Sequence, residues 1–221
     1  ANSKRVLALG GAKNHIVVMP DANKDAGSRD IISSAFGMSG QRCMAVSVMI
    51  GVGNIDEVYK EVISKAKNMV PGVDLPPVIS EAAIKKIEDY LDYAHENGAE
   101  IVVDGRKVKT DEGYFIGPSI IDWGNSQKMS SEEIFGPVLE IRSANTIAKA
   151  AAIQNQSPYG NAAAIFTQNG RFVDEAIREF QAGMLGVNIG VPVPREPFSF
   201  GGIKDSKFGY GDITGVSSID F

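Results

Sequence analysis

The sequence is poor in several residue types and segments that mark particular classes of protein. It has one cysteine, two histidines and one tryptophan in 221 residues, and no internal repeat. A single cysteine excludes an internal disulfide, as is usual in a reducing compartment. No apolar run approaches the length that spans a bilayer, and the first residues lack the apolar core of a signal peptide. We therefore expect a cytoplasmic protein, or a matrix protein in a eukaryote, that does not enter a membrane.

Charge and histidine content exclude further functions. The formal net charge is −5, and no long run of one sign occurs, which argues against nucleic acid as a partner. Neither His15 nor His95 lies in a Cys/His cluster with metal-ligand spacing, so no metal site and no cysteine-hydrolase dyad is expected. Residues 10–13, Gly-Gly-Ala-Lys, superficially resemble a phosphate loop but fit neither the Walker A nor the dinucleotide spacing. A small polar metabolite is the expected ligand.

What the chain does contain is a regular alternation of short apolar segments, and 43% of its residues are hydrophobic. Hydrophobic periodicity predicts strands and helices in turn. The expected strands are residues 5–9, 16–19, 46–52, 101–103, 114–121, 138–141, 162–166 and 184–189, the first two joined by a tight turn. Strands separated by helices predict an α/β fold, an open twisted and mainly parallel sheet with helices on both faces.

The helix boundaries rest on capping signals. Helices are expected over residues 25–36, 147–153 and 171–180, after a capping box of Asn54 and Glu57, and between the cap Ser80 and the terminator Gly98. The last segment, residues 191–221, is rich in Gly, Pro and Phe and is expected to be an ordered loop. Its aromatic side chains Phe198 and Phe200 are available to line a pocket.

Cys43 is the first candidate for chemistry. It follows a helical segment and two glycines, Gly37 and Gly40, that let the backbone fold closely around a reactant. Arg42 precedes it, and a neighbouring guanidinium favours the thiolate, which is the nucleophilic form. A lone cysteine is also commonly a small core residue. Residue types alone leave the two readings about equally supported.

A second candidate segment is Glu132-Glu133-Ile134-Phe135-Gly136-Pro137. In an extended chain, neighbouring side chains point to opposite faces, so one glutamate can face a pocket while the other faces solvent. A charged loop leading into the next strand is the simpler reading. The sequence by itself leaves both open.

Three patches together resemble the aldehyde dehydrogenase superfamily, in matching order over essentially the whole chain. They are Gly-Gln-Arg-Cys at 40–43, Glu-Glu-Ile-Phe-Gly-Pro-Val at 132–138 and Phe-Gly-Gly-Ile-Lys at 200–204. The segments 11–15, 41–45 and 184–194 are more narrowly similar to the CoA-acylating branch that oxidises methylmalonate or malonate semialdehyde. The resemblance implies the catalytic domain of that family, with NAD as cofactor and CoA as co-substrate.

The resemblance also implies roles for single residues. Cys43 matches the nucleophile, and its backbone N–H would help to bind the oxyanion. Glu133 matches the glutamate that holds the nicotinamide ribose, and Phe135 the aromatic beside the nicotinamide. Arg42 matches the arginine that grips the substrate carboxylate, while Asn188 and Phe200 are expected to line the substrate site.

Departures from the family pattern bear on the mechanism and on completeness. Most members carry a water-activating glutamate where this chain has Leu9, and a glycine where it has Pro76. Residues 1–221 are expected to be a catalytic domain without the cofactor domain and terminal oligomerisation strand, inactive alone and part of a homo-oligomer when complete. The alternative is a non-enzymatic domain of the same fold that binds a partner or an acyl group.

Overall fold

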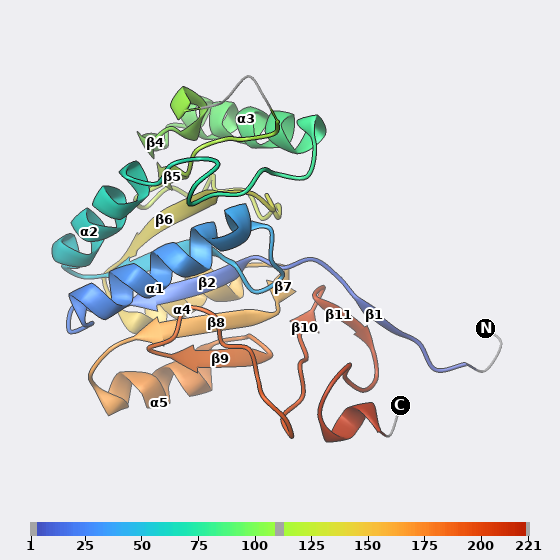
Figure 1. The fold of residues 1–221 in the computed structure, drawn as a ribbon. Helices are drawn as coiled ribbons and strands as arrows, with labels where there is room; N and C mark the ends of the chain where they lie inside the picture. The colour runs from blue at the N-terminus through green and yellow to red at the C-terminus, as the bar shows by residue number, and fades with distance from the viewer. Residues whose placement is uncertain (1–3, 109–112, 220–221) are drawn as a thin grey trace.

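The computed structural model describes residues 4–108 and 113–219, and a seven-stranded sheet forms its centre (Figure 1). All neighbouring strands in the sheet are parallel except β4 and β5. In spatial order the strands are β4 (Glu100–Val103), β5 (Ser119–Asp122), β6 (Val138–Ala144), β3 (Val46–Val52), β2 (Asn14–Val18), β8 (Ala162–Phe166) and β9 (Met184–Val187). The predicted fold class is confirmed.

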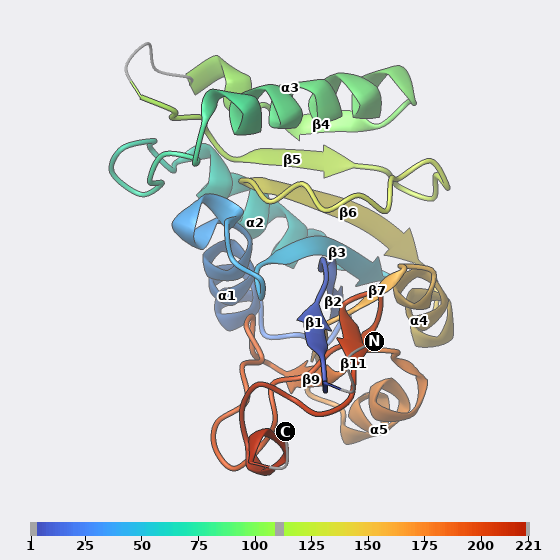
Figure 2. The ribbon, with the colours of Figure 1, turned by 90° about the vertical axis from the view of Figure 1, so that its right-hand side faces the viewer.

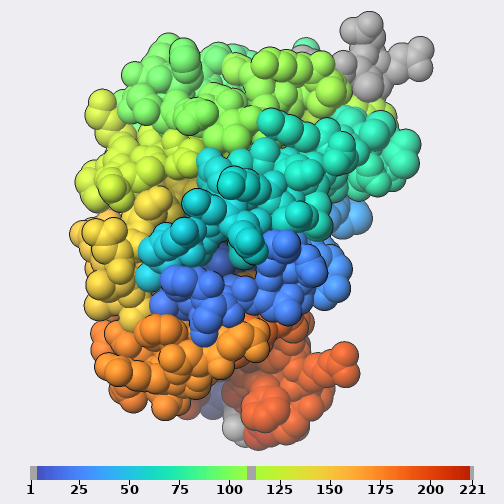
Figure 3. Space-filling view, turned by 90° about the vertical axis from the view of Figure 1, so that its left-hand side faces the viewer, coloured from blue at the N-terminus to red at the C-terminus, as the bar shows by residue number. Residues whose placement is uncertain are grey.

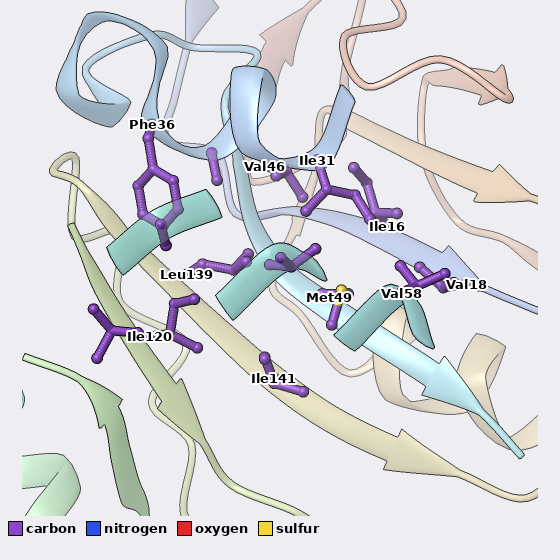
Figure 4. Close-up of a cluster of buried hydrophobic side chains, with 14 of the residues drawn as sticks. Ile16, Val18, Ile31, Phe36, Val46, Met49, Val58, Ile120, Leu139 and Ile141 are labelled. Atoms are coloured by element: carbon purple, nitrogen blue, oxygen red, sulfur yellow. The ribbon is translucent and has the colours of Figure 1, made fainter. Parts of the chain in front are cut away.

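Helices cover both faces of this sheet (Figure 2). Helices α1 (Lys24–Phe36) and α2 (Asp56–Lys67) lie on one face, and α4 (Ile147–Asn155) and α5 (Gly170–Glu179) on the other. Helix α3 (Glu81–Glu96) packs over the β4–β5 end. Figure 4 shows the core beneath α1 and α2, where Ile31 and Phe36 meet Leu139 and Met49. Each such side chain contributes about 1.5–3 kcal/mol when fully buried.

Side-chain caps begin most helices. Asn23 accepts a hydrogen bond from Ala26 N, and Ser80, Thr146 and Asn169 cap α3, α4 and α5 in the same way. Gly98, at φ +85°, follows α3 as predicted. The capping box predicted for α2 is wrong: Ile55 is its cap residue, and Asn54 Oδ1 accepts from Asp56 N, two residues on.

Strand β1 (Leu7–Leu9) does not form the expected hairpin with β2. It pairs antiparallel with β11 (Lys207–Gly209), outside the main sheet. The segment expected to be a loop thus contributes β11, β10 (Ile203–Lys204), which pairs with β7 (Tyr159–Gly160), and a short helix η3 (Val216–Ser218). The strand predicted from residue 114 begins only at Ser119. These pairings join segments too distant in sequence for local periodicity to indicate them.

Because β2, β3 and β8 are parallel, all three begin at the same end of the sheet, where Cys43 precedes β3 and Asn14 opens β2. Their carboxyl ends lie together at the opposite end, which we call the carboxyl-end edge, and from there the chain continues into the helices. Figure 3 views this carboxyl-end edge, where the start of α1 (blue) lies beside α2 (turquoise), with α5 (orange) below.

Candidate active site

Cys43 lies in the short loop between the helical turn η1 (Gly37–Gly40) and strand β3. It is a free thiol and is exposed, although Met44 and Ala45, which follow it, are buried. The reading of Cys43 as a core residue is therefore excluded. The loop presents one exposed sulfur above a well-packed edge of the sheet.

Two asparagines hold the backbone of this loop. Asn14 Nδ2 donates to Cys43 O at 2.9 Å and to Ala45 O at 2.8 Å, and Asn161 Nδ2 donates to the same Cys43 oxygen at 3.0 Å. Asn14 Oδ1 in turn accepts from Asn161 Nδ2 and from Ala162 N. Because both side chains are buried, these bonds fix the carbonyl side of Cys43 against the starts of β2 and β8.

The turn η1 brings a second loop, residues 132–137, against the cysteine loop. Met38 and Ser39 have φ of 54°, and Gly40 has φ +69°. A Cβ on Gly40 would lie 2.1 Å from Gly136 O, so only glycine permits this contact. A narrow cleft of about 10 Å³ runs between the loops and is lined by residues that include Arg42, Glu133 and Phe135.

Lysines anchor the second loop through its backbone. Lys13 Nζ donates to Glu132 O at 2.8 Å, and Lys86 Nζ donates to Glu133 O at 2.6 Å. The side chain of Glu133 is half-buried, and burial raises the pKa of its carboxyl, opposed by a hydrogen bond from the Ala12 backbone. Phe135 has φ +56° and is 46% exposed. The cleft is therefore lined by a carboxylate and an aromatic ring together with Arg42, the residue before Cys43.

Arg42 lies in the same cleft, but its guanidinium also has a structural contact. Nη2 donates to Ser33 O at 2.6 Å and to Ser34 O at 2.9 Å, the last-turn carbonyls of α1. A cation there stabilises the negative end of the helix. Nε is buried and has no hydrogen-bond partner among the described residues.

The other two predicted site residues, Phe200 and Asn188, lie near opposite ends of the strands. Phe200 is partly buried against Met44 and Met184, next to the cysteine loop. Asn188 follows the last residue of β9, at the carboxyl-end edge. Its side-chain Oδ1 accepts from Thr167 N, and its Nδ2 donates to Thr167 O. That placement corrects the expectation for Asn188: its hydrogen bonds join the ends of β8 and β9, away from Cys43.

Sequence reasoning missed the two asparagines that hold Cys43. Asn14 stands inside one of the patches that carried the resemblance, so a signal was present. Asn161 directly precedes β8 and has no local signature, because its significance comes from a backbone oxygen 118 positions away.

Two kinds of feature are absent from the described ranges, residues 4–108 and 113–219. No group of three or more His, Cys, Asp or Glu side chains there can hold a metal ion. No helix in that part of the chain has the length and apolar character needed to cross a membrane.

Known proteins resemble the chain over its whole length. Malonate-semialdehyde dehydrogenase 2 of Geobacillus kaustophilus is 42% identical over 231 residues, which cover 100% of this chain and 48% of that protein. The acylating mitochondrial methylmalonate-semialdehyde/malonate-semialdehyde dehydrogenase of Rattus norvegicus is 41% identical, over 100% of this chain and 43% of that protein. The chain thus spans about half the length of the curated relatives it matches.

A solved structure agrees with these relatives. A protein assigned as a methylmalonate-semialdehyde dehydrogenase of Sinorhizobium meliloti 1021, in complex with NAD, superposes with a TM-score of 0.94 at 35% identity, over 99% of this chain and 47% of that one. The profile of the aldehyde dehydrogenase family matches residues 1–221. The chain belongs to the aldehyde dehydrogenase family.

Proposed function

We propose that the chain is the catalytic part of an NAD-dependent, CoA-acylating dehydrogenase of methylmalonate or malonate semialdehyde. The observation that carries the proposal is the exposed Cys43, whose neighbour Arg42 lines one cleft with Glu133 and Phe135. A domain that never meets a nicotinamide has no physical need for that carboxylate and that ring close to the loop of a free thiol. The names of the relatives supply the substrate class.

Cys43 is the proposed nucleophile. Its thiolate adds to the aldehyde carbon to give a hemithioacetal, and loss of hydride from that carbon leaves a thioester. NAD, when bound, accepts the hydride. The bonds from Asn14 and Asn161 fix the loop that carries the sulfur, so that the backbone N–H of Cys43 can be held toward the developing oxyanion.

The residues present fit one end of the cofactor. Glu133 offers a half-buried carboxylate that can accept hydrogen bonds from a ribose, and Phe135 an exposed ring for the nicotinamide. The 10 Å³ cleft between the loops is too small for a dinucleotide, and the chain has no dinucleotide fingerprint. The remaining cofactor surface is therefore proposed to lie outside these 221 residues.

Arg42 is the proposed partner of the substrate carboxylate. Its Nη2 donates to the end of α1, whereas its buried Nε has no hydrogen-bond partner among the described residues. A guanidinium fixed by a helix end is preorganised for a planar anion. Phe200, beside Met44, is the proposed apolar wall of the same site.

CoA is the proposed acceptor of the acyl group. Leu9 stands where family members carry a water-activating glutamate, and it lies on β1, 49% exposed. A leucine cannot remove a proton from water, so the thioester must wait for a better nucleophile such as a thiol. We propose loss of the substrate carboxylate as CO₂ and release of acetyl-CoA or propionyl-CoA.

The test is made on the complete polypeptide that carries this chain. We expect NADH formation from either semialdehyde only when CoA is present, with acyl-CoA as the product detected by mass spectrometry. Cys43→Ser should abolish NADH and acyl-CoA together. The 221 residues alone should give no turnover. Fast steady-state release of free acid without CoA, or full activity of Cys43→Ser, would contradict the proposal.

The setting of the complete protein is proposed from the same relatives. We place it in the cytoplasm, or in the matrix when the source is eukaryotic, with a small-molecule substrate. Strand β9 leaves one edge of the sheet open among the described residues, beside exposed Val187 and Ile189. An open apolar edge favours pairing with another strand, which supports a homo-oligomer.

A further inference from the structure

A small cavity lies on the face of the sheet turned away from Cys43. Side chains alternate along β2, so Lys13 and His15 face this cavity whereas Asn14 between them faces the cysteine loop. The cavity has a volume of about 70 Å³. Strand β6, the end of α4 and residues 127–131 close it, and its polar lining comes from Lys13, His15, Arg142, Gln127, Gln156 and the three serines 130, 131 and 157.

Positive charge exceeds negative charge around this cavity. Lys13 and Arg142 are each only 3% exposed, and Lys204 Nζ is held nearby on Ser157 O. Among the described residues, the acidic side chain in this cluster is Glu140. It forms an ion pair with Lys13 at 2.5 Å and accepts hydrogen bonds from Tyr90 and Trp123. Arg142 makes one long hydrogen bond there, 3.4 Å from Nε to Gly124 O.

His15 adds unused hydrogen-bonding capacity. The residue is 2% exposed, and neither ring nitrogen has a partner in good hydrogen-bonding geometry in the described structure, although the backbone of Lys13 lies close enough to oppose the lowering of the His15 pKa. Burial, with the charges of Lys13, Arg142 and Lys204, lowers its pKa to about 3. A neutral imidazole still offers one N–H donor, and a buried polar group without a partner costs about 1–3 kcal/mol. Such a group therefore calls for a ligand or ordered water.

We propose that this cavity binds one small tetrahedral oxyanion, phosphate or sulfate, held by Arg142, by His15 and by the serine hydroxyls. Water can satisfy the imidazole but does not balance the buried cations, whereas an anion does both. A volume of 70 Å³ exceeds the space of one water and leaves room for a polyatomic ion. The site is independent of the chemistry proposed for Cys43, because it lies on the other face of β2.

The test is an isothermal titration of the complete polypeptide with inorganic phosphate, with sulfate and with chloride at matched ionic strength. We expect saturable binding of phosphate or sulfate at one site per chain, and a melting temperature that rises with the logarithm of oxyanion concentration. Absence of saturation, or equal stabilisation by chloride, overturns the proposal.

Variants then place the binding in this cavity. Arg142→Met keeps the length of the side chain but removes the charge, and should weaken phosphate binding at least about tenfold. Arg171→Met removes an exposed arginine on α5 and should leave the affinity unchanged. Unchanged binding in Arg142→Met overturns the assignment.

A measurement on the wild-type protein tests the same site even if Arg142→Met does not fold. The side-chain ¹⁵N signals of His15, assigned by their loss in His15→Leu, should shift on addition of phosphate. Those of His95, exposed on α3, should not. Equal shifts of both, or no shift of the His15 signals, would show that the anion does not enter the cavity.

Discussion

At the scale of single residues, buried polar groups form a hydrogen-bonded cluster near the end of the sheet where its strands begin. Lys13, part of the glycine turn that superficially resembles a phosphate loop, is buried in an ion pair with Glu140. Glu140 Oε1 also accepts from Tyr90 Oη and Trp123 Nε1. Burial first, and then the charge of Glu140, raise the pKa of the Tyr90 hydroxyl. A lysine so engaged is a framework residue, which joins the glycine turn to the 132–137 loop.

The asparagine pair leads to a prediction at the same scale. Asn161→Ala removes one of the two donors to Cys43 O and leaves Met44 and Asn14 with fewer partners. We expect the free energy of unfolding to fall by about 1–3 kcal/mol and kcat of the complete protein to fall about tenfold or more, because the nucleophile loses its alignment. Urea denaturation and steady-state NADH formation measure the two effects.

The matched control is Asn68→Ala, at the exposed end of α2. It should change neither quantity by a comparable amount. If both variants behave alike, Asn161 does not position the cysteine loop.

At the scale of elements, the active-site geometry depends on how closely η1 approaches the loop before β6. The two elements meet through backbone atoms, Gly40 against the carbonyl of Gly136. Helix α1 ends at Phe36, and the left-handed φ values near +54° at Met38 and Ser39 break the helical path in η1. The chain therefore turns sharply there, and Arg42 folds back onto the last carbonyls of α1.

This contact predicts unequal effects of one substitution at two glycines. Gly98→Ala, at φ +85° with open space around it, should cost about 1–2 kcal/mol from the backbone conformation alone. Gly40→Ala, at φ +69°, adds a clash at 2.1 Å with a backbone oxygen, for about 1–3 kcal/mol more. Chemical denaturation measures both.

The rate of Cys43 alkylation by iodoacetamide should change in Gly40→Ala and not in Gly98→Ala. Equal losses of stability in the two variants would show that the loops are free to separate without cost.

At the scale of the whole molecule, the free energy of unfolding should depend on pH because of His15, which is buried on the central strand β2. The pKa of His15 is about 3 in the folded chain against an ordinary value of 6.5. Between these values the unfolded chain binds a proton that the folded chain excludes, so stability falls as pH is lowered, by about 1.4 kcal/mol per pH unit from this group. Above pH 6.5 the contribution is constant.

His15→Leu should therefore flatten the dependence of unfolding free energy on pH between about pH 6.5 and 4, measured by urea denaturation in chloride buffers. His95→Leu, at an exposed position on α3, should leave the slope as in the wild type. A His15→Leu curve parallel to that of the wild type would contradict a neutral buried imidazole.

Local sequence patterns were sufficient to predict the positions of most helices and strands. Periodicity located α1, β3, β8 and α5 within a few residues, because each has one face in a core and the apolar spacing records it. Periodicity located β1 but not its partner β11, and it missed the short strands β10 and β11 in the segment after residue 191. The pairing of strands that are distant in sequence leaves no periodic pattern in either segment.

Two properties could be predicted from the residues alone and are confirmed, the mainly parallel sheet with helices on both faces and the family. The roles that the resemblance implies for Cys43, Glu133 and Phe135 stay predictions. Three facts needed the folded chain: Cys43 is exposed, Asn14 and Asn161 hold its backbone, and Asn188 lies at the carboxyl ends of the strands. The physical reason is that apolar periodicity is a local property of the chain. Exposure, hydrogen-bond partners and the edge at which a residue lies depend on which distant segments are packed together.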